Sequence, residues 1–211
     1  MKKEEIDRQQ FEKILDCIIA SLMKQGLKVT TMDSIASSLK MSKRTLYEMF
    51  GSKEDMFREV HQYFHKKIGE AHKEIFESSG NIMEAIIRCF LYNRDLMSNV
   101  SADFLKDIEQ YSNHSEILSD CKQRHLHQNL YDVLKRGVDE GYFRPDINLE
   151  IQSRMIILQM QSLKMAPQLF PEDISLLEVY DNIIIGLLRA VSTQKGLGEL
   201  EKAVESLSQR R

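Results

Sequence analysis

The stretch TTMDSIASSLKMSKRTLYEMFGSKEDMF, residues 30–57, contains start signals for three helices in quick succession. Thr30 or Thr31 can cap the first helix, because a side-chain oxygen at the N-cap accepts a hydrogen bond from a free N–H of the first turn. Ser42 can cap the second helix. Ser52 can cap the third, with Asp55 three residues later at the spacing of a capping box. The expected ranges are 31–38, 42–49, and Lys53 to about Phe76.

The two short helices have the dimensions of a helix-turn-helix, in which one helix enters the major groove of DNA and the other braces it. The bracing requires apolar side chains at the crossing, and the stretch supplies Ile35, Ala36, Leu39, Met41 and Leu46. Ala36 is small where the two helices would approach most closely. The residues left to point outward from the second helix are Ser42, Lys43, Arg44, Thr45 and Tyr47.

The net charge is −3, which by itself argues against binding to nucleic acid. Its distribution argues the other way. Residues 1–67 hold 13 Lys and Arg against 10 Asp and Glu, whereas the remaining residues hold 16 basic and 22 acidic side chains. The sign therefore changes along the chain, and a local basic footprint matters more for DNA binding than the total.

The rest of the chain also predicts helices. No strand-like alternation persists, and the residues from Phe11 to Leu22 form one apolar helical stripe, which predicts a helix from Glu4 to Met23. We expect an all-α protein of nine or ten helices. The further predicted helices are 82–97, 100–111, 115–140, 148–165, 173–194 and 199–208.

Residues 14–57 resemble the DNA-binding domain of the TetR family of bacterial transcriptional regulators. The resemblance rests on Gly26 followed by Thr30 and Thr31, then on IA at 35–36, Ser42 and TLYEMFGSKEDMF at 45–57. The family usually has glycine where this chain has Lys40. If that turn needs a positive φ, lysine costs about 1 kcal/mol there relative to glycine.

The resemblance implies a role for each polar residue of the motif. Thr31 and the amides beside it would hold a phosphate, and Lys43 and Arg44 would reach base edges. Thr45 would meet a thymine methyl or a phosphate. The alternative is that these side chains form an ordinary solvated face, with Tyr47 in the core. The full expected set of DNA-binding residues is Thr31, Lys40, Ser42, Lys43, Arg44, Thr45, Tyr47 and Lys53.

The helices expected at 148–165 and 173–194 are apolar around most of their circumference, so both sides must be covered. A second subunit would cover one side, with Gly186 allowing a close crossing. The alternative is that they are central helices of a large monomer. A two-fold homodimer would also match a pseudo-palindromic operator. The candidate interface residues are Ile156, Met160, Leu163, Tyr180, Ile184, Leu187, Leu188 and Val191.

The resemblance further implies two domains and an effector pocket. The DNA-binding domain would span 1–52, helix 53–77 would connect, and 53–211 would form a helical domain for ligand binding and dimerisation. An unknown small-molecule effector would act by favouring a dimer geometry that no longer fits the operator. Each pocket candidate can also be read as plain core or surface. The candidate wall residues are Phe90, Met97, Phe104, Leu105, Tyr131 and Met155, with Arg94, His127 or Gln159 as polar anchors.

The sequence offers no chemistry for an enzyme: it has no glycine-rich phosphate loop and no nucleophile elbow. His61 and His65, and likewise Cys121 and His125, have a spacing that suits a metal, but no further ligand accompanies either pair. We expect no metal and no cofactor.

The apolar run at 182–191 is too short to span a bilayer, and three scattered cysteines suit a reducing compartment. We therefore expect a cytoplasmic, ligand-responsive repressor that binds double-stranded operator DNA as a dimer. The alternative is a helical interaction or scaffold protein with vestigial DNA binding.

Overall fold

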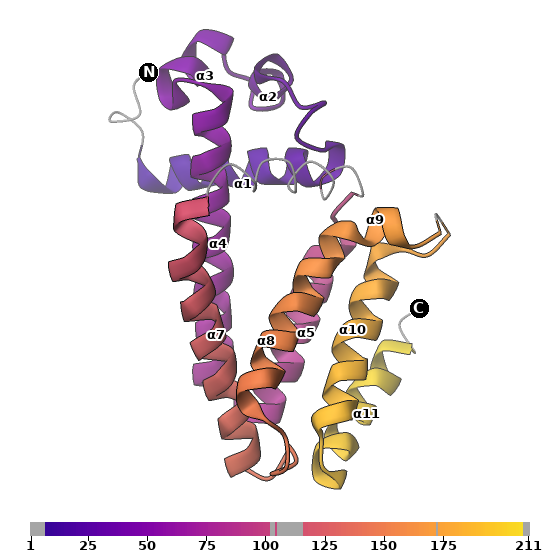
Figure 1. Ribbon diagram of the computed structural model, residues 1–211. Helices are drawn as coiled ribbons and strands as arrows, with labels where there is room; N and C mark the ends of the chain where they lie inside the picture. Colours follow the sequence, from indigo (N-terminus) through magenta and orange to yellow (C-terminus); the bar gives the residue numbers. More distant parts are fainter. Residues whose placement is uncertain (1–6, 102–103, 105–115, 172, 209–211) are drawn as a thin grey trace. The chain divides into compact units, whose positions relative to one another are not determined.

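The computed structural model of the protein describes residues 7–101, 104, 116–171 and 173–208 (Figure 1). Every regular element in these ranges is a helix, and one isolated antiparallel bridge joins Phe143 to Ser192. The predicted all-α class is confirmed. None of the helices described combines the length and hydropathy needed to cross a membrane.

Most helix bounds agree with the sequence within a few residues. The helices are α1 (Arg8–Gln25), α2 (Met32–Ser38), α3 (Lys43–Phe50), α4 (Lys53–Ser78), α5 (Ile82–Ser98), α7 (Glu116–Asp139), α8 (Leu149–Ser162), the 3-10 helix η2 (Leu163–Met165), α9 (Ala166–Leu169), α10 (Leu176–Val191) and α11 (Gln194–Ser208). Helix α11 begins five residues before its predicted start, because the Thr193 hydroxyl accepts a bond from the N–H of Gly196 and opens it early. Nearly all of the helix expected at 100–111 lies outside the described residues.

The chain divides into two compact units, and the boundary falls inside α4, between Lys73 and Glu74. Unit 1 comprises, among the described residues, 7–73, 99–101 and 104. Unit 2 comprises 74–98, 116–171 and 173–208. The functional division at residue 52 stays a prediction.

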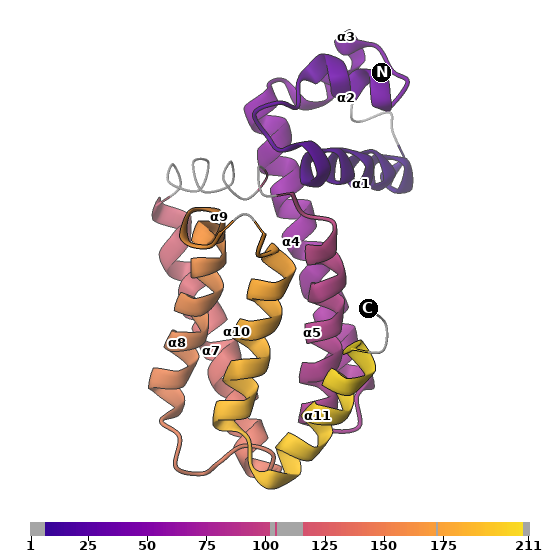
Figure 2. The same ribbon diagram turned by 90° about the vertical axis from the view of Figure 1, so that its right-hand side faces the viewer.

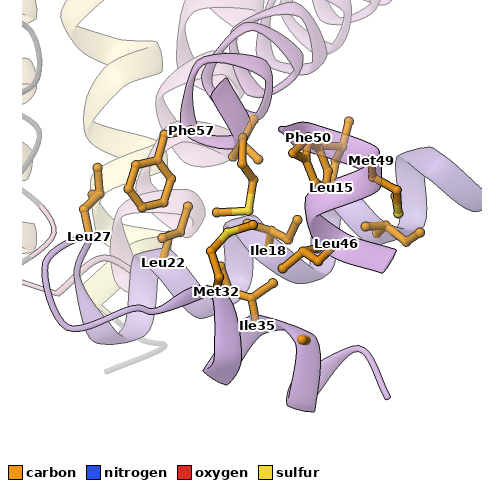
Figure 3. Packing of buried hydrophobic residues seen from close by; sticks show 14 residues of the cluster. Leu15, Ile18, Leu22, Leu27, Met32, Ile35, Leu46, Met49, Phe50 and Phe57 are labelled. Atoms are coloured by element: carbon orange, nitrogen blue, oxygen red, sulfur yellow. The ribbon is translucent and has the colours of Figure 1, made fainter. Parts of the chain in front are cut away.

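The core of unit 1 joins α1, α2, α3 and the first turns of α4 (Figure 3). Ile18, Ile35, Leu46 and Met56 come from these four helices in turn, and none is more than 1% exposed. Fully burying one such side chain contributes about 1.5–3 kcal/mol. Leu46 therefore fixes α3 against the other three helices and determines which of its faces stays in solvent.

The core of unit 2 lies among α5, α7, α8, α10 and α11. At one end of this bundle, the turn before α8 lies beside the turn between α10 and α11 (Figures 1 and 2). The N–H of Arg144 donates to the Val191 carbonyl, and that of Thr193 donates to the Tyr142 carbonyl, each at 2.9 Å. Phe143 between them is 1% exposed. The segment expected as a break between helices is therefore part of the core.

Candidate DNA-binding surface

The amino end of α2 is closed by Thr31. Its hydroxyl accepts a bond from the N–H of Ser34 at 3.1 Å, and its own N–H donates to the Ser34 hydroxyl at 2.9 Å, which completes a capping box. Thr30 is 1% exposed, and its hydroxyl donates to the Gly26 carbonyl at 2.6 Å. Of the two candidate caps, Thr31 is the cap, and Thr30 pins the preceding turn. Thr31 therefore stands in solvent at the start of the motif.

The turn between α2 and α3 is left-handed at Lys40, whose φ is +53°. Lys40 is the one non-glycine residue with positive φ in the part of the chain that the structure describes. The N–H of Met41 donates to the Ala36 carbonyl at 2.9 Å, as in a helix that ends through a left-handed residue. A side chain at this φ costs roughly 1 kcal/mol. The turn therefore has the geometry for which glycine is the unstrained residue.

Helix α3 separates an apolar face from a polar one. Ser42 caps it by accepting the N–H of Thr45 at 3.0 Å, and the two hydroxyls lie 2.8 Å apart. Leu46, Met49 and Phe50 are buried. The residues that are wholly or partly exposed along its length are Lys43, Arg44, Thr45, Tyr47 and Glu48. Thus Ser42, Lys43, Arg44, Thr45 and Tyr47 do lie together on the outward side, as the sequence predicted.

The two cations of this face are each held by a carboxylate. The Lys43 ammonium lies 2.9 Å from a carboxylate oxygen of Asp33 on α2, and the Arg44 Nε lies 2.9 Å from Glu48 one turn along α3. These hydrogen bonds raise the pKa of Lys43 and of Arg44, while the pKa of Glu48 is lowered chiefly by Arg44. All three groups therefore stay charged near neutral pH.

Sequence reasoning missed both carboxylates. The four-residue spacing of Arg44 and Glu48 on one helix is a readable signal for an ion pair. Asp33 and Lys43 are ten residues apart on different helices, so their contact depends on how α2 crosses α3.

Lys53 and Tyr47 differ in how freely they face solvent. Tyr47 is 43% exposed. Lys53 is half-buried: its ammonium donates to the Leu27 carbonyl at 3.1 Å and lies 5.2 Å from the centre of the Phe57 ring. An ammonium has three donors, so this bond leaves others for a phosphate. Lys53 also ties α4 to the chain between α1 and α2.

The predicted pocket residues lie in different surroundings. Phe90 is buried and stacks on Tyr180, with ring centres 5.7 Å apart. The Arg94 Nε lies 2.9 Å from Asp181, so this predicted anchor already has an ionic partner. Met97 and Tyr131 are half-buried in unit 2, Met155 is 44% exposed, and Phe104 packs against the core of unit 1. Leu105 lies outside the described residues.

Two predicted anchors carry buried polar atoms. Among the described residues, the buried Gln159 Oε1 has no hydrogen-bond partner, and the buried His127 Nε2 has the Glu150 carboxylate 3.3 Å away as its ionic partner. Two hollows of about 380 and 320 Å³ open elsewhere, one along α1 and α4 and one along α10. Neither is lined by a predicted pocket residue.

The predicted interface residues lie mostly inside unit 2. Ile156, Leu163, Tyr180, Leu188 and Val191 are each at most 9% exposed within the single chain, whereas Met160, Ile184 and Leu187 are half-buried. The strongly exposed apolar side chains of α8 are Ile151, Met155 and Leu158, at 58%, 44% and 58%. Their spacing of four and three residues places them on one face of the helix, a signal that the sequence already contained.

The histidine pair on α4 forms as its spacing suggested, with the Nε2 atoms of His61 and His65 3.0 Å apart. Within the described ranges, no three metal-ligating side chains gather into a site. The side chains of Cys121 and His125 are not among those that the structure describes.

Comparison with known proteins gives a family match for the DNA-binding motif and several similar regulators. Residues 14–60 match the sequence model for bacterial regulatory proteins of the tetR family. The chain is 28% identical over 147 residues to the HTH-type transcriptional repressor KstR2 of Mycobacterium tuberculosis, covering 68% of this chain and 74% of that protein.

Solved structures share the fold. The ketosteroid transcriptional regulator KstR2 of Mycobacterium tuberculosis superposes with a TM-score of 0.59 at 20% identity, over 90% of this chain and 98% of that one. A TetR-family regulator from Agrobacterium tumefaciens gives 0.69 at 12% identity, over 89% and 100%. Residues 14–60 therefore carry the motif of the bacterial regulatory proteins of the tetR family, and the chain shares its fold with solved regulators of that family.

Proposed function

We propose that this protein is a transcriptional repressor that recognises a pseudo-palindromic DNA operator as a homodimer and is released by a small-molecule effector. The observation that carries the proposal is the exposed face of α3, where Lys43 and Arg44 stand on a helix whose opposite face is buried at Leu46. A helix presented in this way fits the major groove.

The contacts divide by what they recognise. Arg44 is assigned to a guanine through O6 and N7, and Lys43 to a neighbouring base edge. Thr31, Ser42, Tyr47 and Lys53 are assigned to phosphates, with Thr45 at a phosphate or a thymine methyl. Lys40 adds a cation toward the DNA backbone. Phosphate contacts position a protein without specifying sequence.

Dimerisation is assigned to α8 and α10. The support is apolar surface on both helices: Ile151, Met155 and Leu158 are exposed on α8, and Ile184 and Leu187 are half-buried on α10. A Cβ added to Gly186 would meet no described atom within 4 Å beyond its chain neighbours and the nearby backbone of its own helix, which leaves room for a partner helix. An operator with two half-sites spaced by a whole helical turn follows from such a two-fold dimer.

Effector binding is assigned to unit 2. The support is Gln159 Oε1, a buried atom without a hydrogen-bond partner among the described residues, because a buried polar group left unbonded costs about 1–3 kcal/mol. A polar ligand group that donated to it would recover that cost.

Titration with the DNA upstream of the protein's own gene tests the proposal at two salt concentrations. We expect specific binding whose log affinity falls linearly with log salt. Arg44→Ala should cost about 1–3 kcal/mol on the specific site and relax its sequence preference, whereas Lys53→Ala should weaken all sequences alike. Lys135→Ala, which removes an exposed lysine from unit 2, is the control. Parent-like binding by both unit 1 variants would overturn the contact assignments. Absence of any specific site would favour a scaffold function.

A further inference from the structure

We infer that Asp33 and Glu48 are specificity-determining residues, which hold the two base-reading cations and weaken their attraction to phosphate. The inference rests on the proposed function and deepens it. It concerns how the protein rejects DNA of the wrong sequence.

The first observation is the geometry at Lys43. Its ammonium lies 2.9 and 3.0 Å from the two carboxylate oxygens of Asp33, a contact that crosses from α3 to α2. Lysine has four rotatable bonds, and ordering its side chain costs about 1.5–2 kcal/mol in rotamer freedom. The ion pair with Asp33 therefore already restricts the Lys43 side chain in the free protein, so less rotamer freedom is lost when DNA binds. The ammonium has three donors, so a base acceptor can bond to it while Asp33 remains bound.

The second observation is the matching arrangement at Arg44. Glu48 accepts the Nε–H of Arg44 at 2.9 Å. The fork that matches guanine O6 and N7 can use the terminal Nη groups, which this bond does not occupy. Each cation is therefore oriented by a carboxylate through a part of the side chain that base reading does not require.

The physical consequence separates the two modes of binding. Non-specific affinity comes almost entirely from unpaired cations meeting phosphates, with release of counterions. A cation already neutralised by a carboxylate contributes less to that term, and the carboxylate itself is repelled by phosphate. A directed hydrogen bond to a base depends on position and survives the pairing. Asp33 and Glu48 thus lower affinity for random DNA more than affinity for the operator.

The test compares Asp33→Asn and Glu48→Gln with the parent on an operator duplex and on a random duplex of equal length, at 50 and 200 mM salt. A cation freed by the substitution makes about one more phosphate contact. One more contact steepens the slope of log affinity against log salt by about 0.9. Between 50 and 200 mM salt, the variant should therefore lose about 3.5-fold more affinity for DNA than the parent loses. We expect random-DNA affinity at 50 mM salt to rise several-fold, while operator affinity changes less, so that their ratio falls.

Asp139→Asn is the matched control, because it also removes a carboxylate from an exposed lysine pair, with Lys135, but in unit 2. It changes the net charge equally and should leave the ratio unchanged. Asp33 also lies in the first turn of α2, where an acidic side chain favours the helix, so the midpoint of thermal unfolding is measured for every variant. A ratio unchanged in folded Asp33→Asn and Glu48→Gln, or lowered equally by Asp139→Asn, would overturn the inference. If instead the parent binds the operator no more tightly than random DNA, the proposed function itself is wrong, and the inference that rests on it is wrong as well.

Discussion

The ion pair between Arg94 on α5 and Asp181 on α10 gives the sharpest stability prediction. Its side chains are 19% and 9% exposed, and the Arg94 Nε donates to both oxygens of Asp181, at 2.9 and 3.1 Å. Removing one member of a desolvated pair leaves the other charge buried, which costs roughly 3–5 kcal/mol. Because Arg94 keeps some contact with solvent, we expect Arg94→Met to lower the free energy of unfolding of unit 2 by about 3 kcal/mol, at the lower end of that range.

The double variant Arg94→Met/Asp181→Leu separates the pair from the packing around it. Replacing a buried ion pair with apolar residues of similar size is often neutral or stabilising. We therefore expect the double variant to regain most of the stability lost by Arg94→Met alone. The two single variants and the double variant form a double-mutant cycle, which isolates the coupling between the two residues.

Urea unfolding followed by circular dichroism at 222 nm measures these differences, provided that the dependence on urea stays constant among variants. Asp139→Asn is the control within the same unit, since its pair with Lys135 is exposed, and it should leave the midpoint unchanged. An Arg94→Met variant as stable as the parent would refute the reasoning. So would a double variant that loses the sum of the two single losses.

Three further predictions concern two backbone positions and a half-buried thiol. Gly51 ends α3 at φ +79° and ψ −63°, and a Cβ there would meet nothing closer than 3.7 Å. Gly51→Ala should therefore destabilise unit 1 through backbone strain alone. The same urea assay should show a loss of about 1–3 kcal/mol in the free energy of unfolding. Lys40→Gly relieves strain but adds freedom to the unfolded chain, so it should change stability by less than about 1 kcal/mol; a larger loss would contradict the account of this turn. Burial raises the pKa of Cys89 to about 11, so its thiolate fraction should still be rising between pH 8 and 10. Peptide-mapped alkylation with iodoacetamide should show that rise, and a plateau below pH 9 would contradict it.

The sequence predicted local structure well where a single residue decides it. Ser42 caps α3 as expected, and the Ser52 hydroxyl accepts the N–H of Asp55 at the start of α4. These bonds span three residues, so their partners are fixed by spacing. The left-handed turn at Lys40 was expected only through the resemblance, because nothing in a lysine itself indicates a positive φ.

Contacts between residues far apart in the sequence could not be predicted from it. Arg94 reads as a free anchor until α10 places Asp181 beside it, and Lys43 reads as an unpaired cation until α2 places Asp33 within reach. Likewise, apolar residues on α8 and α10 were assigned to a partner subunit, yet Ile156 and Leu188 are covered by the chain's own core. Which side of an apolar helix faces inward depends on all its neighbours together, so periodicity alone could not decide it.

The buried turn around Phe143 limits how this protein can be engineered. A Cβ placed on Gly137 would lie 2.1 Å from Cδ2 of the Phe143 ring, and one on Gly196 would lie 2.3 Å from the Tyr142 carbonyl. Reporter domains, affinity tags or new chain termini are usually placed in loops between helices, and this loop has the composition of a suitable one. The backbone of the loop around Phe143 is hydrogen-bonded to the turn between α10 and α11. An insertion into this loop would therefore also disturb the packing of α8 against α10 and α11. The exposed residues around Ile174, ahead of α10, are the better place for a biosensor fusion.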